Sequence, residues 1–367
     1  MENKSKKILF LINKLGVGGA ERVFVNDVNA LNGMGFDVYL ATLFGRQEDQ
    51  TMLSEVNIPS QNIFHINSKN IKDFSLYKKL ISILKDEKID KIISTLNEAN
   101  LVARVVNLWL PRLDVFIREA NVAGPKPIKF KFLDILLNLF VRKIICVSEE
   151  VRKSLQKYQP FYKNKMVVLM NGVFVPNVEK NYDSSSKVVK ILNVGSLNPK
   201  KGQTYFIEAL GKIKKEGVAF EACIYGKGIE ESNLKNRIIE MGLENDISIK
   251  SPVPQAQLSK EYLGADIFVL SSLWEGCPNV LLEAMAHGTA SVSTDVSGAR
   301  DIVVDGESGF VVPIRDVDFM SRRIIELAKD PGLRETFGIA AKNRILHEYS
   351  IDKHIKRLIN FIYEEAC

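Results

Sequence analysis

Residues 266–288 read DIFVLSSLWEGCPNVLLEAMAHG and contain a complete strand, turn and helix. Residues 266–270 form an apolar run typical of a buried strand, and residues 280–286 predict a short helix that a glycine ends. Glu275 is expected on the loop at the carboxyl end of the strand and Glu283 in the opening turns of the helix. Open α/β sheets bind ligands at this end of their strands. The two carboxylates therefore suit a ligand rich in hydroxyl groups, or else they are solvated acids beside a capped helix.

The same strand-and-helix rhythm runs through the whole chain. Continuous apolar strands that alternate with amphipathic helices indicate parallel sheets covered on both faces. A chain of 367 residues exceeds what one core usually fills, so two domains are expected, with a polar linker around 177–187. The predicted strands are 7–12, 37–42, 91–96, 115–118 and 144–148 in the first half, and 191–194, 222–225, 247–249, 267–270, 291–294 and 310–312 in the second.

Composition narrows the class of protein. The net charge of +6 suits an anionic small ligand or an anionic membrane surface. The sequence contains no basic block with interleaved aromatics, so nucleic acid is not the expected partner. The four cysteines lie far apart and fit neither a disulfide framework nor a metal site. Asp316-Val317-Asp318 resembles a metal-binding D-x-D motif but precedes a helical pattern, so we predict a helix N-cap, no metal and no cofactor. The apolar run 8–12 is too short for a signal peptide, and a cytoplasmic protein is expected.

Four further segments accompany the two carboxylates: Gly16–Arg22, Asn171–Val173, Val194–Gly202 and Ser293–Ala299. In this order and spacing they resemble the large retaining family of nucleotide-sugar glycosyltransferases numbered family four, over nearly the whole chain. The resemblance implies the GT-B fold, in which two doubly wound Rossmann-like domains face a cleft. It implies an acceptor-binding domain at 1–175, a nucleotide-sugar-binding domain at 188–350, and a C-terminal helix, 351–367, that crosses back to the first domain.

The resemblance also assigns roles to single residues. Lys201 holds the leaving diphosphate and Glu275 binds the sugar hydroxyls, so these two are the predicted catalytic residues. Glu283 binds the ribose hydroxyls, because a carboxylate accepts from a pair of hydroxyls. Ser196 stands where the family has an arginine, which removes one cation from the diphosphate site. The remaining predicted donor contacts are Gly18, Gly19, Cys277, Asn279 and Val280.

The chain departs from the family pattern in its first half. No histidine lies near Ile117–Asn121, where many members have one, and Arg118, Glu119 and Asn121 are the tentative acceptor or donor contacts in its place. Phe174 replaces an aspartate that often follows Asn-Gly-Val. The G-x-G-G spacing at Gly16–Gly19, without an acid at the end of the second strand, disfavours a nicotinamide dinucleotide.

The implied activity is transfer of a sugar from a nucleotide diphosphate sugar, with a UDP-sugar favoured, to an acceptor hydroxyl with the anomeric configuration retained. The expected acceptor is a lipid-linked glycan of bacterial surface polysaccharide synthesis, with a soluble glycan as the other option. A nucleotide-sugar epimerase or sugar-phosphate synthase on the same fold, or a non-catalytic sugar-binding protein, are the alternatives.

Residues 126–143 combine an apolar run with lysines and arginines on both sides. The run is too short to span a bilayer. Two interpretations stay open: a helix that lies in an anionic membrane interface, which would make the protein peripheral on the inner face of the cell membrane, or a core helix with a basic collar.

Overall fold

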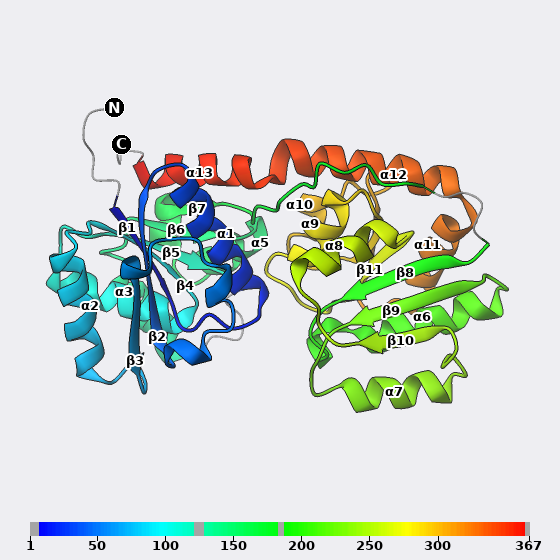
Figure 1. Ribbon diagram of the computed structural model, residues 1–367, viewed down its shortest axis with the longest axis horizontal. Helices are drawn as coiled ribbons and strands as arrows, with labels where there is room; N and C mark the ends of the chain where they lie inside the picture. The colour runs from blue at the N-terminus through cyan, green and yellow to red at the C-terminus, as the bar shows by residue number, and fades with distance from the viewer. Residues whose placement is uncertain (1–6, 121–127, 183–186, 364–367) are drawn as a thin grey trace. The chain divides into compact units, whose positions relative to one another are not determined.

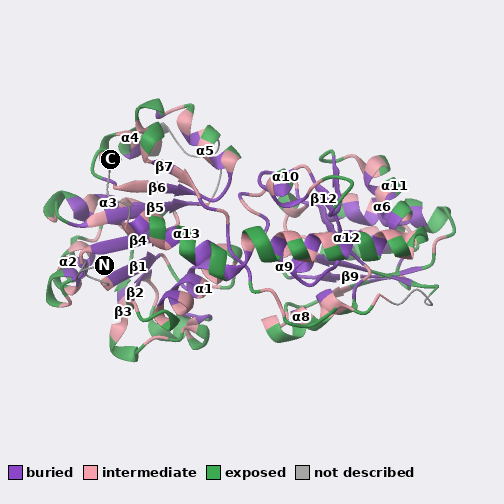
Figure 2. Ribbon diagram, turned by 90° about the horizontal axis from the view of Figure 1, so that it is seen from above, coloured by how far each residue is buried: buried purple, intermediate pink, exposed green. Residues whose placement is uncertain are grey.

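The computed structural model describes residues 7–120, 128–182 and 187–363, without the side chains of 128–130 (Figure 1). The chain forms two compact units. One contains Met1–Gly172 with Ile351–Cys367, and the other contains Val173–Ser350. In both units the central strands are buried and the outer faces of the helices are exposed (Figure 2).

The first unit is built on a seven-stranded parallel sheet in the order β3-β2-β1-β4-β5-β6-β7. Chain order reverses between β1 and β4, which is the point where doubly wound sheets bind ligands. The strands are β1 (Lys7–Ile12), β2 (Asp37–Phe44), β3 (Ile63–Ser68), β4 (Lys91–Thr95), β5 (Asp114–Glu119), β6 (Lys143–Cys146) and β7 (Met166–Val168). The helices are α1 (Gly19–Gly33), α2 (Phe74–Asp86), α3 (Asn97–Trp109), α4 (Ile128–Leu137), α5 (Glu149–Gln156) and α13 (Ile351–Tyr363), with a 3₁₀ segment η4 (Pro160–Lys165).

The C-terminal helix α13 belongs to the first unit, as the predicted crossing of this helix requires. Its apolar side chains recur at helical spacing, and Ile355, Leu358 and Ile362 are buried in the same core as Phe10 and Phe24. Helix α13 therefore completes the hydrophobic core around α1 and β1.

The second unit carries a six-stranded parallel sheet in the order β10-β9-β8-β11-β12-β13, with its reversal between β8 and β11. The strands are β8 (Val189–Val194), β9 (Phe220–Tyr225), β10 (Ile247–Lys250), β11 (Ile267–Leu270), β12 (Ala290–Thr294) and β13 (Phe310–Val312). The helices are α6 (Gln203–Lys215), α7 (Glu231–Glu240), α8 (Gln255–Gly264), α9 (Asn279–Ala286), α10 (Ala299–Ile302), α11 (Val317–Lys329) and α12 (Pro331–Arg344).

The predicted pair of doubly wound Rossmann-like domains is confirmed, and two strands are absent from the prediction. β3 lies at one edge of its sheet, half-exposed and interrupted by polar side chains. β7 lies at the other edge and has three residues. β3 therefore lacks the continuous apolar run by which buried strands are recognised, whereas β7 lies in the apolar run 166–170, which the prediction left out.

Part of the predicted linker belongs to the second unit and packs against the end of α8. The Lys180 ammonium donates to the carbonyls of Tyr262, Leu263 and Ala265, at the C-terminal end of α8, over 2.6 to 3.0 Å. A cation at this end also interacts favourably with the helix dipole. Burial lowers the pKa of Lys180 to about 8. Residues 183–186 of the predicted linker lie outside the described residues.

Candidate active site

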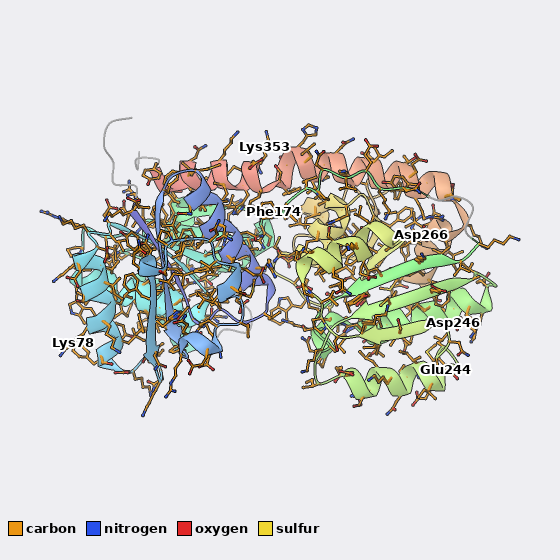
Figure 3. All side chains as sticks on the ribbon, in the orientation of Figure 1. Lys78, Phe174, Glu244, Asp246, Asp266 and Lys353 are labelled. Atoms are coloured by element: carbon orange, nitrogen blue, oxygen red, sulfur yellow. The ribbon has the colours of Figure 1, made fainter. Side chains whose placement is uncertain are left out.

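The loops that follow β8 and β11 meet at the reversal point of the second sheet. The first loop contains Gly195–Gly202 and leads into α6, and the second contains Ser271–Pro278 and leads into α9. Leu273 donates its N–H to the Lys200 carbonyl at 2.7 Å, and the Ser271 hydroxyl donates to the Lys201 carbonyl at 2.9 Å. Asp266 marks the opposite end of β11 (Figure 3), where its carboxylate accepts the N–H of Lys190 at 2.8 Å. The hydrogen bonds of Leu273 and Ser271 join the two loops into one rim at the carboxyl edge of the sheet.

Two glycines make this close approach feasible. Gly202 has a φ of +62° and begins α6, and a Cβ there would collide with the Ser271 carbonyl oxygen. A Cβ on Gly226, after β9, would collide with the Gly195 carbonyl oxygen. Any larger residue at either position would push the loops apart.

The rim brings together the two residues predicted as catalytic. Lys201 Nζ lies 2.5 Å from Glu275 Oε1, and the two side chains are 17% and 12% exposed. The Ser272 hydroxyl donates to the same carboxylate oxygen at 2.6 Å. A cation and a carboxylate in contact at a sheet reversal can bind a phosphate and a neighbouring hydroxyl, respectively, when a ligand replaces their mutual ion pair.

The position that lacks the expected arginine is neutral. Ser196 is exposed, and its hydroxyl accepts a hydrogen bond from the Asn198 side-chain amide at 2.7 Å. Lys200 is also exposed, and its backbone carbonyl accepts the N–H of Leu273 in the β11 loop. Within Gly195–Gly202, Lys201 is therefore the cation that pairs with Glu275.

Residues 277–280 form the start of α9, where Pro278 is the N-cap and the helix begins at Asn279. Cys277, Asn279 and Val280 are partly exposed. The first turn of a helix presents N–H groups without intrahelical partners, and together with the helix dipole they attract phosphate. The Ser297 hydroxyl donates to the Gly276 carbonyl at 3.3 Å and so stabilises the turn that precedes α9.

Glu283 lies one turn further along α9 and is 8% exposed. The Tyr262 hydroxyl, on α8, donates to Glu283 Oε2 at 2.9 Å. Tyr262 is fully buried and packs edge-to-face against Phe268 on β11. Burial raises the pKa of Tyr262 well above its usual value, and the charge of Glu283 adds to the rise, so this hydroxyl stays protonated and donates. Tyr262 therefore fixes the orientation of one carboxylate oxygen.

In the first unit, Gly16–Gly19 follows β1 and α1 begins at Gly19. Gly18 is the N-cap in an extended conformation, and a Cβ there would collide with the Glu21 carboxylate. Burial raises the pKa of Glu21. The loop lies at the reversal of the first sheet. The donor contacts of Gly18 and Gly19 stay predictions.

Two family models match the chain. One, described as Glycosyltransferase Family 4, matches residues 17–175, and the other, described as Glycosyl transferases group 1, matches residues 160–344, half of the chain. The chain is a group 1 glycosyl transferase. The rim formed by the β8 and β11 loops lies within the second matched segment, and Gly18 and Gly19 lie within the first.

Relatives of this glycosyltransferase align along nearly its whole length. An uncharacterized glycosyltransferase of Haemophilus influenzae is 29% identical over 96% of this chain and 98% of its own length. The UDP-Gal:α-D-GlcNAc-diphosphoundecaprenol α-1,3-galactosyltransferase of Escherichia coli is 24% identical over 93% and 92%. The crystal structure of Anabaena HepE in complex with UDP has a TM-score of 0.82 at 18% identity, over 96% of this chain and 98% of that one. The structural likeness establishes the shared GT-B fold.

The structure places Arg118 in a buried ion-pair network of the first unit. Its Nη1 lies 2.6 Å from Asp27 Oδ2 on α1, and His354 Nε2 on α13 lies 3.0 Å from the other oxygen of the same carboxylate. Burial alone would raise the pKa of Asp27, but Arg118 and His354 outweigh it and hold the pKa below its usual value. These bonds join β5, α1 and α13, which favours a structural role for Arg118 over ligand contact.

Glu119 is also buried, and Arg104 on α3 pairs with it at 3.1 Å. Arg104 holds Asp134 of α4 at 3.1 Å as well. Glu119 therefore belongs to the packing of α3 and α4 on the sheet, and its predicted role in ligand contact gains no support from this geometry. Asn121 lies outside the described residues.

Tyr262, Lys180 and Asp27 are functional or structural partners that the sequence did not reveal. Tyr262 lies in an unremarkable helical pattern, and Lys180 lies in a polar run that predicts a linker. Among the described residues no group of three or more metal-ligating side chains could hold an ion. Asp316 caps α11, accepting the N–H of Phe319 at 2.8 Å.

Proposed function

We propose that this glycosyltransferase transfers a hexosyl group from a UDP-sugar to an acceptor hydroxyl with retention of the anomeric configuration. The observation that carries the proposal is the Lys201–Glu275 pair at the β8–β11 reversal, with Glu283 one turn along the helix α9 that follows. The choice of UDP is supported by HepE, whose structure contains UDP, and by the E. coli relative, whose name includes UDP-Gal.

In the proposed reaction the bond between the sugar C1 and the diphosphate oxygen breaks, and the acceptor oxygen bonds C1 on the same face. The acceptor proton passes to the leaving phosphate, so no protein nucleophile is required. Negative charge develops on the β-phosphate. Lys201 and the backbone N–H groups at the start of α9 are in place before the reaction and stabilise this charge, which lowers the barrier.

The two glutamates have different environments and therefore different proposed tasks. Glu275 is held by Ser272 and orients the sugar hydroxyls once Lys201 turns to the diphosphate. Glu283 is held by Tyr262 and accepts from the ribose hydroxyls. Ser196 supplies no charge, so the loop after β8 provides the diphosphate with one cation where the family pattern has two.

We propose a lipid-linked glycan as the acceptor, bound by the first unit, with the enzyme on the cytoplasmic side of the membrane. The E. coli relative is named for an acceptor carried on diphosphoundecaprenol, and it aligns over 93% of this chain. Among the residues that the structure describes, no helix is long and apolar enough to cross a membrane.

The proposal is tested by a donor screen that measures release of UDP with a lipid extract as acceptor, followed by NMR of the new glycosidic bond. UDP release that depends on the lipid extract supports the proposal. The new glycosidic bond should be axial when the bond from the sugar to the diphosphate in the donor is axial. Lys201→Ala should abolish most of the release. Lys212→Ala, which removes an exposed lysine paired with Asp318 on the same unit, is the matched control. Interconversion of the donor sugar without an acceptor, or transfer only to a sugar phosphate, would assign the fold to one of the alternative activities.

A further inference from the structure

Helix α4 and the turn after it expose a continuous set of large apolar side chains. The set comprises Phe132, Leu133, Leu136, Leu139 and Phe140, which are 39% to 63% exposed. Their spacing places them on one face of a helix. The opposite face carries Asp134 and Asn138, both buried and both bonded to Arg104. The core-helix interpretation of this segment therefore holds for one face, and the other face is left without cover.

A second segment, distant in sequence, joins this face. Phe161 in η4 is 90% exposed. Its neighbour Tyr162 donates to the carbonyl of Ile135 in α4 at 2.8 Å. Lys165, at the end of η4, donates to the carbonyls of Asn138 and Leu139 at 3.0 and 2.7 Å. We call the exposed apolar side chains of α4 and its turn, together with Phe161, the α4–η4 surface.

The charge around this surface is strongly positive. Residues 131–165 contain eight lysines and arginines and three acids, whereas the whole chain has a net charge of only +6. Asp134 is paired with Arg104 from outside this stretch, Glu149 and Arg152 within it offset each other, and the third acid, Glu150, is exposed. Lys157 and Lys163 are exposed on either side of Phe161.

We propose that the α4–η4 surface docks onto an anionic lipid bilayer. The apolar side chains would enter the boundary between headgroups and acyl chains, and the flanking lysines would lie among anionic headgroups. Charge selects this occupant over a second copy of the chain, because two copies face to face would bring like charges together. The inference rests on the proposed function in one respect: a lipid-linked acceptor explains why an enzyme would dock there.

The test is co-sedimentation of the full chain with vesicles of phosphatidylcholine and phosphatidylglycerol, compared with phosphatidylcholine alone. Wild-type protein should bind the mixed vesicles, lose binding as salt rises, and bind the neutral vesicles poorly. Phe161→Ser and Leu136→Ser/Leu139→Ser should each weaken binding. Lys163→Ser should lower affinity roughly fivefold. The substituted side chains are exposed, so these variants should keep the wild-type unfolding temperature.

Two variants on the second unit are matched controls. Ile229→Ser removes an equally exposed apolar side chain, and Lys235→Ser removes an exposed lysine of α7. Both should bind vesicles like the wild type. Equal losses in the controls, or full binding by Leu136→Ser/Leu139→Ser, would overturn the proposal. So would wild-type protein that ignores anionic vesicles at low salt, or that forms a dimer which Leu139→Ser dissolves.

Failure of this inference and failure of the proposed function give different results. An enzyme that releases UDP with acceptor but ignores vesicles keeps the function and loses the α4–η4 surface as a bilayer contact. A protein that binds anionic vesicles through this surface but turns over no nucleotide sugar keeps the surface and loses the function.

Discussion

Glu283→Ala, compared with Tyr262→Phe/Glu283→Ala, separates loss of donor binding from loss of stability in the second unit. Glu283 is 8% exposed, so solvent screens its hydrogen bonds little. A hydrogen bond to a charged group contributes about 1.5–3 kcal/mol. Loss of the proposed ribose contact should therefore weaken UDP binding by roughly 10- to 150-fold.

The same substitution has a cost in stability that the structure also predicts. The hydroxyl of Tyr262 is fully buried and loses the carboxylate to which it donates. An unsatisfied buried donor costs about 1–3 kcal/mol of unfolding free energy. Tyr262→Phe/Glu283→Ala removes both partners, so it should recover part of this stability but none of the affinity.

Isothermal titration with UDP and thermal unfolding of the full chain measure the two effects. Glu244→Ala, which truncates an exposed glutamate of the same unit (Figure 3), is the matched control and should leave both unchanged. Unchanged affinity in folded Glu283→Ala would remove this residue from the donor site. Recovery of affinity in the double variant would show that the single variant bound poorly because it was unstable.

Three further predictions concern catalysis and acid stability. Lys201→Ala should lower kcat by roughly 10²- to 10³-fold, the usual effect of losing one stabiliser of transition-state charge, and a kcat within a factor of two or so of Lys212→Ala would refute the role. Turnover should survive excess chelator, and activity that is lost and then restored by manganese or magnesium would reveal a metal site. The depressed pKa of Asp27 contributes stability above its unfolded value near 3.8, and this stability should disappear as pH falls through the folded value. Asp27→Asn should flatten that part of the acid-unfolding profile of the first unit, and an unchanged profile would place the acid sensitivity elsewhere.

The fold was accessible from sequence because its central strands are continuous apolar runs. β1, β4, β8 and β11 lie inside their sheets, and each was predicted from such a run. β3 was missed because polar side chains interrupt it, whereas β7 lies in the apolar run 166–170 and could have been recognised from the sequence. The glycine turns after β1 and β8 were located correctly because a tight strand-to-helix turn leaves glycines at fixed positions.

The candidate site was only partly accessible, because pairing between distant residues leaves no local signal. Lys201 and Glu275 were named separately, and their contact joins positions 74 residues apart. Arg118 was given a tentative ligand contact because it is a polar residue at a strand end. Its partner Asp27 lies 91 residues away, in the middle of α1, and nothing in either segment indicates the pair.

The replacement of the expected arginine by Ser196 changes how the rest of the rim must work. In the proposed reaction, with Lys201 as the one cation of the β8 loop that pairs with Glu275, developing charge on the diphosphate would be shared between Lys201 and the N–H groups that open α9. Those N–H groups are placed by Pro278, and the turn before them is held by Ser297 through the Gly276 carbonyl. On the proposed mechanism, the geometry of the α9 turn therefore matters more with Ser196 than it would with an arginine at this position. Introducing Ser196→Arg should tighten UDP binding if the second cation is simply missing, and should leave it unchanged if the α9 turn already compensates for it.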